Sequence, residues 1–394
     1  MIAPSARNVR SLERWLMAEP RSEDPAAFLR ALAARLTLFG IPLWRVSYAL
    51  MTMHPEVLWR TVQLRGTDVA VRDQPHARLD DPFYTKSAVA VVRRSRSPVR
   101  VPLVPGDLPF PICIDLRDEG GTDYVVHPLP FSNGEVSYVS FASDAPGGFS
   151  DGDLTTFEDI APFLARRIEL ESAYYATRAL LDVYLGKNAA RRVAAGAFQR
   201  GQGELIDAAI WFSDMRDFTA LTDGAPPVQV IATLDGYFDA VASAIAAHGG
   251  EVLKFIGDAV LAIFPVAADA RAACRHALAA AEEAFASLAR MNETRAARGE
   301  PVVAIGVALH RGNVMYGNIG ARDRLDFTVI SSSVNEASRL ESLCKELKTS
   351  LALSETFART ADVLGLVDLG EHALKGVKAK LRVFSIPAAM KANP

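Results

Sequence analysis

Hydrophobic positions in the first part of the chain switch between helical and strand-like spacing. Phe28, Leu32, Leu36 and Phe39 recur at helical spacing and stop at a glycine, which predicts a helix. Apolar stretches then predict strands at WRVSYALMTM, VLWRTVQLRG, YVVHPLPF and EVSYVSFAS. Clusters of proline and glycine separate these strands. Residues 1–152 are therefore predicted to form a first domain of mixed helices and strands.

Residues 153–203 are predicted to form a helical linker. Phe157, Leu164 and Ile168 belong to a near-heptad apolar seam that Pro162 interrupts. Two interpretations carry equal weight: a surface helix packed on its own domain, or a dimerising helix between two domains. The basic, glycine-punctuated stretch YLGKNAARRVAAGAFQRGQGE follows and has the composition of a hinge or docking segment.

From residue 204 to 388 strands and helices alternate, which predicts an α+β or α/β domain. IDAAIWFSDM is a predicted strand, and PPVQVIATLDGYFDAVASAIAAHGG is a helix closed by two glycines. KFIGDAVLAIF has the pattern of a hairpin that turns at Gly257-Asp258. A long alanine-rich helix follows. VVAIGVALHRGNVMYGNIG predicts two strands, FTVI another, SVNEASRLESLCKEL a helix, and HALKGVKAKLRVFSI a terminal hairpin.

Composition narrows the class of protein. A chain of 394 residues with 50% hydrophobic content suits two domains, and its net charge of −3 gives no general attraction to nucleic acid. Cys113, Cys274 and Cys344 are odd in number and far apart, so neither a disulfide framework nor a zinc site is predicted. The N-terminus lacks a signal-peptide core, and no uncharged apolar run approaches the roughly 20 residues of a spanning helix. We expect a cytoplasmic protein without a membrane span.

Two aspartates follow or interrupt apolar strands in the second domain. Asp214 comes just past a strand end, and Asp258 lies at the tip of the hairpin. Either aspartate alone is more often a turn or a helix cap. On adjacent strand ends the two would supply the hard oxygen ligands that Mg²⁺ prefers when it also binds phosphates. Phe218 and Thr219 begin the next segment, where backbone N–H groups can meet a phosphate.

An amide and a guanidinium share one face of a predicted helix. Asn335 and Arg339 are four residues apart in SVNEASRL. These groups suit a ribose oxygen and a phosphoryl oxygen, respectively. A solvated helix face is an equally weighted alternative for this pair taken alone.

Five ordered sequence blocks make residues 204–388 resemble the class III nucleotide cyclase catalytic domain. They are FSDMRDFT, EVLKFIGDAVLAIF, HRGNVMYGNIG, DFTVISSSVNEASRLE and LKG. The resemblance implies a ferredoxin-like βαββαβ core with additions. It also implies conversion of a nucleoside triphosphate to the 3′,5′-cyclic monophosphate and pyrophosphate, with two divalent cations, Mg²⁺ or Mn²⁺, in each active site.

The resemblance also implies roles for residues around the triphosphate. Asp214 and Asp258 match the metal-binding aspartates, and the carbonyl of Met215 would complete one metal site. Lys375, in LKG, resembles a triphosphate-binding lysine.

Base and ribose recognition would use a second group of residues. Lys254 matches the lysine that reads the purine, and Thr328 occupies the position of its partner. Asn335 matches the ribose-orienting asparagine, and Arg339 matches the arginine that stabilises the transition state.

In this family the two groups belong to different chains of a head-to-tail dimer, so we expect a homodimer with two shared sites. Lys254 can donate to adenine N1 while the Thr328 hydroxyl accepts from N6, whereas guanine reverses that pattern. ATP is therefore the expected substrate. Ser331-Ser332 stands where many relatives have Gly-Asp or Gly-Asn, and Thr328 resembles a subgroup linked to bicarbonate stimulation; the effect of either on rate is left open.

The first domain resembles a GAF-type sensor, a helix-and-strand domain that leads by a helix into a catalytic domain. Its regulator, a small molecule or a protein, cannot be read from the sequence, and a purely structural dimerising role stays open. His54, His76 and His127 are isolated and are expected to be structural or solvated.

These observations lead to the hypothesis that the protein is an adenylate cyclase regulated by its N-terminal domain. A non-catalytic nucleotide-binding module and a guanylate cyclase are the alternatives. A diguanylate cyclase would need a GG[DE]EF-like hairpin, and this hairpin contains FIGDA.

Overall fold

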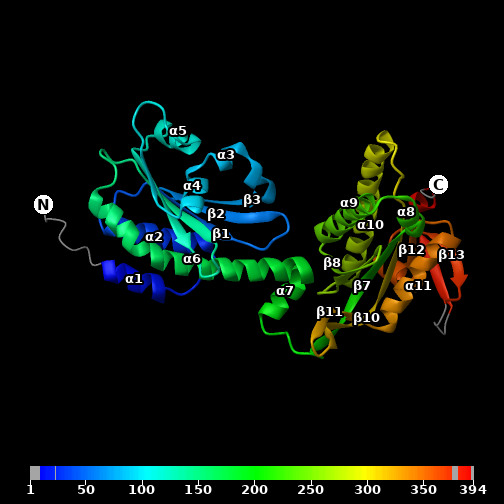
Figure 1. Cartoon of the computed structure of the whole chain (residues 1–394). Helices are drawn as coiled ribbons and strands as arrows, with labels where there is room; N and C mark the ends of the chain where they lie inside the picture. Colours follow the sequence, from blue (N-terminus) through cyan, green and yellow to red (C-terminus); the bar gives the residue numbers. More distant parts are fainter. Residues whose placement is uncertain (1–8, 23, 375–379, 392–394) are drawn as a thin grey trace. The chain divides into compact units, whose positions relative to one another are not determined.

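The computed structural model describes residues 9–22, 24–374 and 380–391. The chain divides into two compact units, Met1–Val183 and Tyr184–Pro394. The division falls inside the segment predicted as a linker. Figure 1 shows the elements of each unit.

Unit 1 is built on an antiparallel sheet in the order β3-β2-β1-β6-β5-β4. Its central strands are buried along their whole length or nearly so, as expected for a sheet covered on both faces. The strands are β1 (Arg45–Met51), β2 (Val57–Arg65), β3 (Asp68–Pro75), β4 (Val99–Pro102), β5 (Asp123–Pro130) and β6 (Val136–Ser143).

Helices cover the two faces of this sheet with separate cores. On one face lie α1 (Val9–Ala18), α2 (Pro25–Leu38) and α6 (Asp151–Leu185), where the rings of Phe141 and Phe157 stack at 4.0 Å. The other face is covered by η1 (His76–Asp80), α3 (Pro82–Thr85), α4 (Ala88–Ser95) and α5 (Pro111–Asp118). The layering is helix, sheet, helix. It agrees with the predicted mixture of helices and strands, while likeness to a GAF domain stays a proposal.

The long helix α6 begins in the core of unit 1. Phe157, Ile160, Leu164 and Ile168 are fully buried against the sheet and α2. The first half of α6 thus packs on its own domain, the first of the two interpretations. Pro162 lies inside the helix on an exposed position and does not end it.

Unit 2 has a sheet in the order β13-β14-β12-β10-β7-β9-β8, with β11 paired to β10. Its strands are β7 (Gly203–Met215), β8 (Glu251–Ile256), β9 (Ala259–Pro265), β10 (Ile305–Ala321), β11 (Arg324–Ile330), β12 (Leu351–Ser354), β13 (Val367–His372) and β14 (Leu381–Ser385). Four successive strands, β7 to β10, lie in the spatial order β10-β7-β9-β8 with helices after the first and third, which is the expected ferredoxin-like βαββαβ arrangement.

The helices of unit 2 pack on both faces of the sheet. Alternation along β7 points Trp211 toward α9 and α10 and points Ile210 toward α7 and α11. The helices are α7 (Lys187–Ala194), α8 (Phe218–Gly224), α9 (Pro227–Ala247), α10 (Ala270–Ala297), α11 (Ser332–Glu346), α12 (Glu355–Ala361) and α13 (Pro387–Lys391).

One prediction for this unit is wrong. VVAIGVALHRGNVMYGNIG was expected to form two strands, but β10 is a single strand that pairs with β7 without a break from Ile305 to Gly317. The long partner strand β7 supplies hydrogen bonds along this whole length, so the glycines inside β10 do not end it. Gly317 is needed there because an added Cβ would clash with the backbone of Gln202 and Gly203.

Helix α9 is long and apolar enough, by length and composition, to cross a membrane. No such segment was expected from the sequence. The helix carries Asp235 and Asp239, and its Tyr237, Val241 and Ile245 side chains lie in the core of unit 2.

Candidate functional site

The two predicted metal-binding aspartates lie side by side at one end of the sheet. Asp214 is the penultimate residue of β7 and is paired with Ala259 of β9, so Asp258 lies beside it. Gly257 forms the turn before Asp258 with a φ of 65°, a conformation that glycine adopts without strain. Burial, and then the neighbouring Asp258, raise the pKa of Asp214 to about 6. Two partly buried carboxylates form a concentrated negative site that a cation would neutralise.

The segment after Asp214 turns sharply into a short helix. Asp217 has a φ of 55° in the left-handed region, and α8 begins at Phe218. Phe218 packs against the core of unit 2, while Thr219 is exposed. Phe218 therefore anchors the loop, and the Thr219 side chain is exposed to solvent.

A buried ion pair lies behind the aspartates, and the sequence did not lead us to it. Arg216 Nη1 lies 3.0 Å from Glu341 Oε1 of α11, and Glu341 is only 4% exposed. Burial raises the pKa of Glu341 to about 7; Arg216 lowers it, and the charges of Asp214 and Asp258 raise it further. Gly306 of β10 leaves the space for Arg216, because an added Cβ would overlap its guanidinium. The pair connects α11 to the strand that carries Asp214.

The proposed base-reading residues come from β8 and β11. Lys254 Nζ donates to Asp326 Oδ2 at 2.6 Å, and this lysine lowers the pKa of the Asp326 carboxyl. Thr328, two residues further along β11, is buried. Side chains two apart on a strand share a face, so Thr328 lies on the same face of β11 as Asp326, the partner of Lys254. Asp326 was missed by the sequence reasoning; its place in DFT, two residues before Thr328, was the available signal.

Asn335 and Arg339 lie on α11, as predicted, and both are exposed. Within the described ranges neither side chain forms a hydrogen bond or ion pair, so both are available to a ligand. Glu341 follows Arg339 by two residues, which is about 200° around a helix. Since Glu341 faces Arg216 and the aspartates, Arg339 faces away from them. A single chain thus presents its aspartates and its arginine in different directions.

Met215 and Lys375 are the other two predicted site residues of this domain. Met215 is buried at the end of β7 and pairs with Ile305. Lys375 lies outside the described residues. Among the described residues no group of three or more His, Cys, Asp or Glu side chains is arranged to hold a metal ion. Asp214 and Asp258 would therefore share any cation with backbone, substrate or water oxygens.

This chain is similar to known proteins. The sequence model of the family described as "Adenylate and Guanylate cyclase catalytic domain" matches residues 203–388. Adenylate cyclase 1 of Rhizobium meliloti (strain 1021) is 31% identical over 259 residues, 64% of this chain and 38% of that protein. Adenylate cyclase of Anabaena cylindrica is 34% identical over 188 residues, 45% of this chain and 36% of that protein.

The chain therefore spans well under half the length of the curated relatives it matches. Among solved structures, a bacterial light-regulated adenylyl cyclase aligns with a TM-score of 0.50 and 18% identity, covering 71% of this chain and 89% of that one. At that identity the likeness concerns the fold alone.

Proposed function

We propose that this chain, whose residues 203–388 belong to the adenylate and guanylate cyclase catalytic domain family, converts ATP to 3′,5′-cyclic AMP and pyrophosphate. The observation that carries the proposal is the Asp214–Asp258 pair. The two aspartates lie side by side, at the end of β7 and in the turn before β9, and the pKa of Asp214 is raised. Relatives named as adenylate cyclases support the choice of reaction.

The carboxylates fit a divalent cation by their chemistry. They are hard oxygen donors on adjacent strands, and their mutual repulsion is relieved by positive charge. Mg²⁺ or Mn²⁺, two in each site, would supply activation of the ribose 3′-hydroxyl and neutralise charge on the triphosphate. Asp214, Asp258 and the Met215 carbonyl would hold these ions, and Arg216 with Glu341 would hold the β7 end and α11 in register.

The remaining residues bind and orient the nucleotide in this proposal. Thr219 and the α8 backbone would face the phosphates, and Phe218 would keep that loop in place. Asn335 holds the ribose so that its 3′-oxygen lies in line with the α-phosphate. Arg339 donates to the phosphoryl oxygens, where negative charge develops during the attack.

The active site would form between two copies of the chain. Arg339 faces away from the aspartates of its own chain, so it would complete the partner's site. Apolar side chains near the hairpin are exposed, namely Phe255 and Ile256, and Val228 and Ile231 of α9 are exposed too. Exposed apolar surface of this kind is typical of surfaces that a second chain covers. A homodimer would contain two such sites.

Base choice depends on the polar side chains around Lys254. Lys254 and Thr328 offer a donor and an acceptor, which suit adenine N1 and N6. Asp326 beside Lys254 is an additional acceptor and favours a second candidate, guanylate cyclase, because guanine N1 and N2 both donate. The N-terminal unit, proposed to be GAF-like, would regulate either activity through α6 and α7.

The decisive experiment is to incubate the purified full chain with Mn²⁺ and either ATP or GTP, and to separate the products by chromatography. We expect cyclic AMP to form faster than cyclic GMP. Asp258→Ala should lower the rate more than about tenfold, since the cations contribute several kcal/mol here, while Asp223→Ala, an exposed aspartate of α8, should not.

The other possible outcomes of this experiment each favour a different function or contradict a site assignment. Faster turnover of GTP would favour guanylate cyclase, with Asp326 accepting hydrogen bonds from guanine. Nucleotide binding without either product would favour the non-catalytic module. An active Asp258→Ala protein would contradict the metal assignment.

A further inference from the structure

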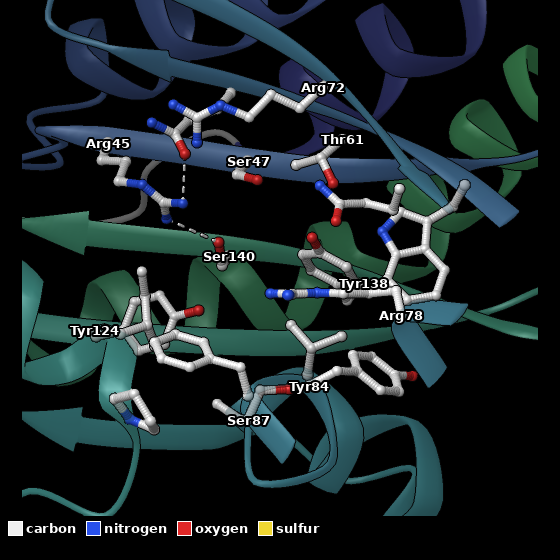
Figure 2. Close-up of a pocket in the computed structure, with 18 residues that line it drawn as sticks. Arg45, Ser47, Thr61, Arg72, Arg78, Tyr84, Ser87, Tyr124, Tyr138 and Ser140 are labelled. Carbon is white, nitrogen blue, oxygen red and sulfur yellow. Dashed lines mark hydrogen bonds between the residues drawn. The ribbon is translucent and has the colours of Figure 1, made fainter. Parts of the chain in front are cut away.

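Unit 1 contains a cavity of about 200 Å³ between its sheet and the helices of one face. β1, β2, β3, β5 and β6 form one side of it, and η1, α3, α4 and α5 the other (Figure 2). The volume lies below the roughly 300–1,000 Å³ typical of sites for drug-sized ligands. The cavity therefore suits a molecule with a single ring better than a nucleotide.

A buried arginine lies at the sheet side of this cavity. Arg45 is 8% exposed, and its guanidinium donates to Gln63 Oε1 at 2.7 Å and to Ser140 Oγ at 3.3 Å. Both partners are neutral. Within the described residues no carboxylate forms an ion pair with Arg45. A buried cation held only by neutral acceptors is costly, and an anion beside it would offset that cost.

Two further arginines line the same cavity. Arg72 comes from β3 and Arg78 from η1, and in Figure 2 the guanidinium groups of Arg45 and Arg78 extend from opposite sides toward the middle of the view. Arg78 pairs with Asp81, which lies outside the lining. Of the described residues that line the cavity, none is Asp or Glu. The charged side chains that line this space are therefore all arginines.

The remaining walls combine hydroxyls with aromatic rings. Ser47 and Ser140 are buried polar residues on β1 and β6. Trp59 and Tyr84 lie with ring centroids 5.1 Å apart, and Tyr124 and Tyr138 add two more rings. Aromatic walls favour a flat partner, and hydroxyls beside a guanidinium favour an oxygen-bearing anion.

We propose that this cavity binds a small aromatic carboxylate, with its carboxylate on Arg45 and its ring between the aromatic walls. Arg78 and Arg72 would close the open side over the ligand. The chain would thus carry a site for a single-ring organic anion in the unit that precedes the catalytic domain. Binding at this site does not depend on the cyclase reaction.

The test is calorimetric titration of the full chain at neutral pH with benzoate and 4-hydroxybenzoate. Benzamide serves as the uncharged counterpart with the same ring, and inorganic phosphate as the anion without a ring. We expect one of the two carboxylates to bind at least about tenfold more tightly than benzamide, because a charge-assisted hydrogen bond contributes about 1.5–3 kcal/mol.

Variants locate the binding. Arg45→Gln keeps a hydrogen-bonding side chain and should weaken carboxylate binding by about tenfold or more while leaving benzamide unchanged. Arg78 is partly exposed, so we expect the Arg78→Gln protein to fold. This variant should also weaken carboxylate binding, and it serves as the test if the Arg45→Gln protein does not fold. Arg94→Gln, an exposed arginine of α4 outside the lining, is the matched control.

Three results would overturn the proposal. One is the absence of carboxylate binding at millimolar concentration. Another is binding of benzamide or phosphate as tightly as the carboxylates. The third is a folded Arg45→Gln or Arg78→Gln protein with unchanged affinity. None of these readouts involves nucleotide turnover, so they are independent of the proposed cyclase activity.

Discussion

At the scale of single residues, the proximity of Asp214 and Asp258 lowers the stability of the metal-free native state at neutral pH. The pKa of Asp214 is raised to about 6 by burial and by Asp258. An aspartate in an unfolded chain titrates near pH 3.9, so between about pH 3.9 and 6 the native state binds more protons than the unfolded one. Native stability therefore falls as pH rises through this window, and the whole penalty remains above it.

Asp214→Asn should accordingly raise the melting temperature of the metal-free protein at pH 7.5. The gain should shrink at pH 4.5, where Asp214 of the wild-type native state is largely protonated. Thermal unfolding in the presence of a chelator at the two pH values measures both. Asp223→Asn is the control, and an equal gain for that variant would contradict the assignment. A destabilised Asp214→Asn protein would do the same.

At the scale of elements, α7 is attached to the sheet of unit 2 by one buried carboxylate. Glu251, the first residue of β8, accepts from Ala189 N at 3.2 Å, Asn188 Nδ2 at 3.3 Å and Tyr316 Oη at 2.9 Å. Lys254 lies three residues further along β8. A displacement of α7 would therefore shift β8, the strand that carries the proposed base-reading lysine.

Glu251→Gln should loosen this attachment. The amide NH₂ cannot accept, so at least one of the three donors loses its buried partner at a cost of about 1–3 kcal/mol. We expect faster hydrogen exchange at Ala189 and neighbouring α7 amides and an altered cyclase rate.

Glu204→Gln is the matched control for this variant. It removes an exposed ion pair between β7 and Arg192 of the same helix, and such pairs contribute little. Exchange in α7 that responds equally to both changes would show that Glu251 is not the anchor.

We expect the helical phase of α6 to affect the cyclase rate. The helix runs unbroken from Asp151 to Leu185, so it begins in unit 1 and ends just past the boundary at Val183. Inserting one alanine after Thr177 rotates the following residues by about 100°, whereas four alanines restore the phase to within about 40°. The single insertion should change the cyclase rate strongly, and the fourfold insertion less.

Circular dichroism serves as the control that both insertion proteins remain folded. Wild-type rates in both would mean that α6 is only a tether.

At the scale of the whole molecule, the proposed site requires two chains. Asp214→Ala and Arg339→Ala homodimers should each be inactive, because every site in them lacks one part. A mixed dimer carries both lesions in one site and leaves the other intact. Random exchange makes half the dimers mixed, so mixing should restore up to roughly a quarter of wild-type activity. Native mass spectrometry would verify the exchange, and exchange without recovered activity would refute shared sites.

The sequence alone determined those features that short stretches encode. The hairpin around Gly257, the strand that carries Asp214 and the helix that carries Asn335 and Arg339 are local patterns, and the structure has these elements where the patterns predicted them. The resemblance of residues 204–388 to the class III nucleotide cyclase catalytic domain rests on the same ordered blocks, and the cyclase family model matches residues 203–388. Local propensity and spacing suffice there because each feature lies within about one helix or one hairpin.

Tertiary structure decided the contacts between residues far apart in the chain. Lys254 meets Asp326 across 72 positions, and Arg45 meets Ser140 across 95. The pairing of these residues cannot be read from their neighbours in the sequence, even though Asp326 stands two residues before Thr328. Burial decided the chemistry of these groups as well, because the raised pKa values of Asp214 and Glu341 and the unpaired charge of Arg45 depend on how much water the folded chain excludes. Solvent exclusion is a property of packing, so no pattern of residues along the chain could supply it.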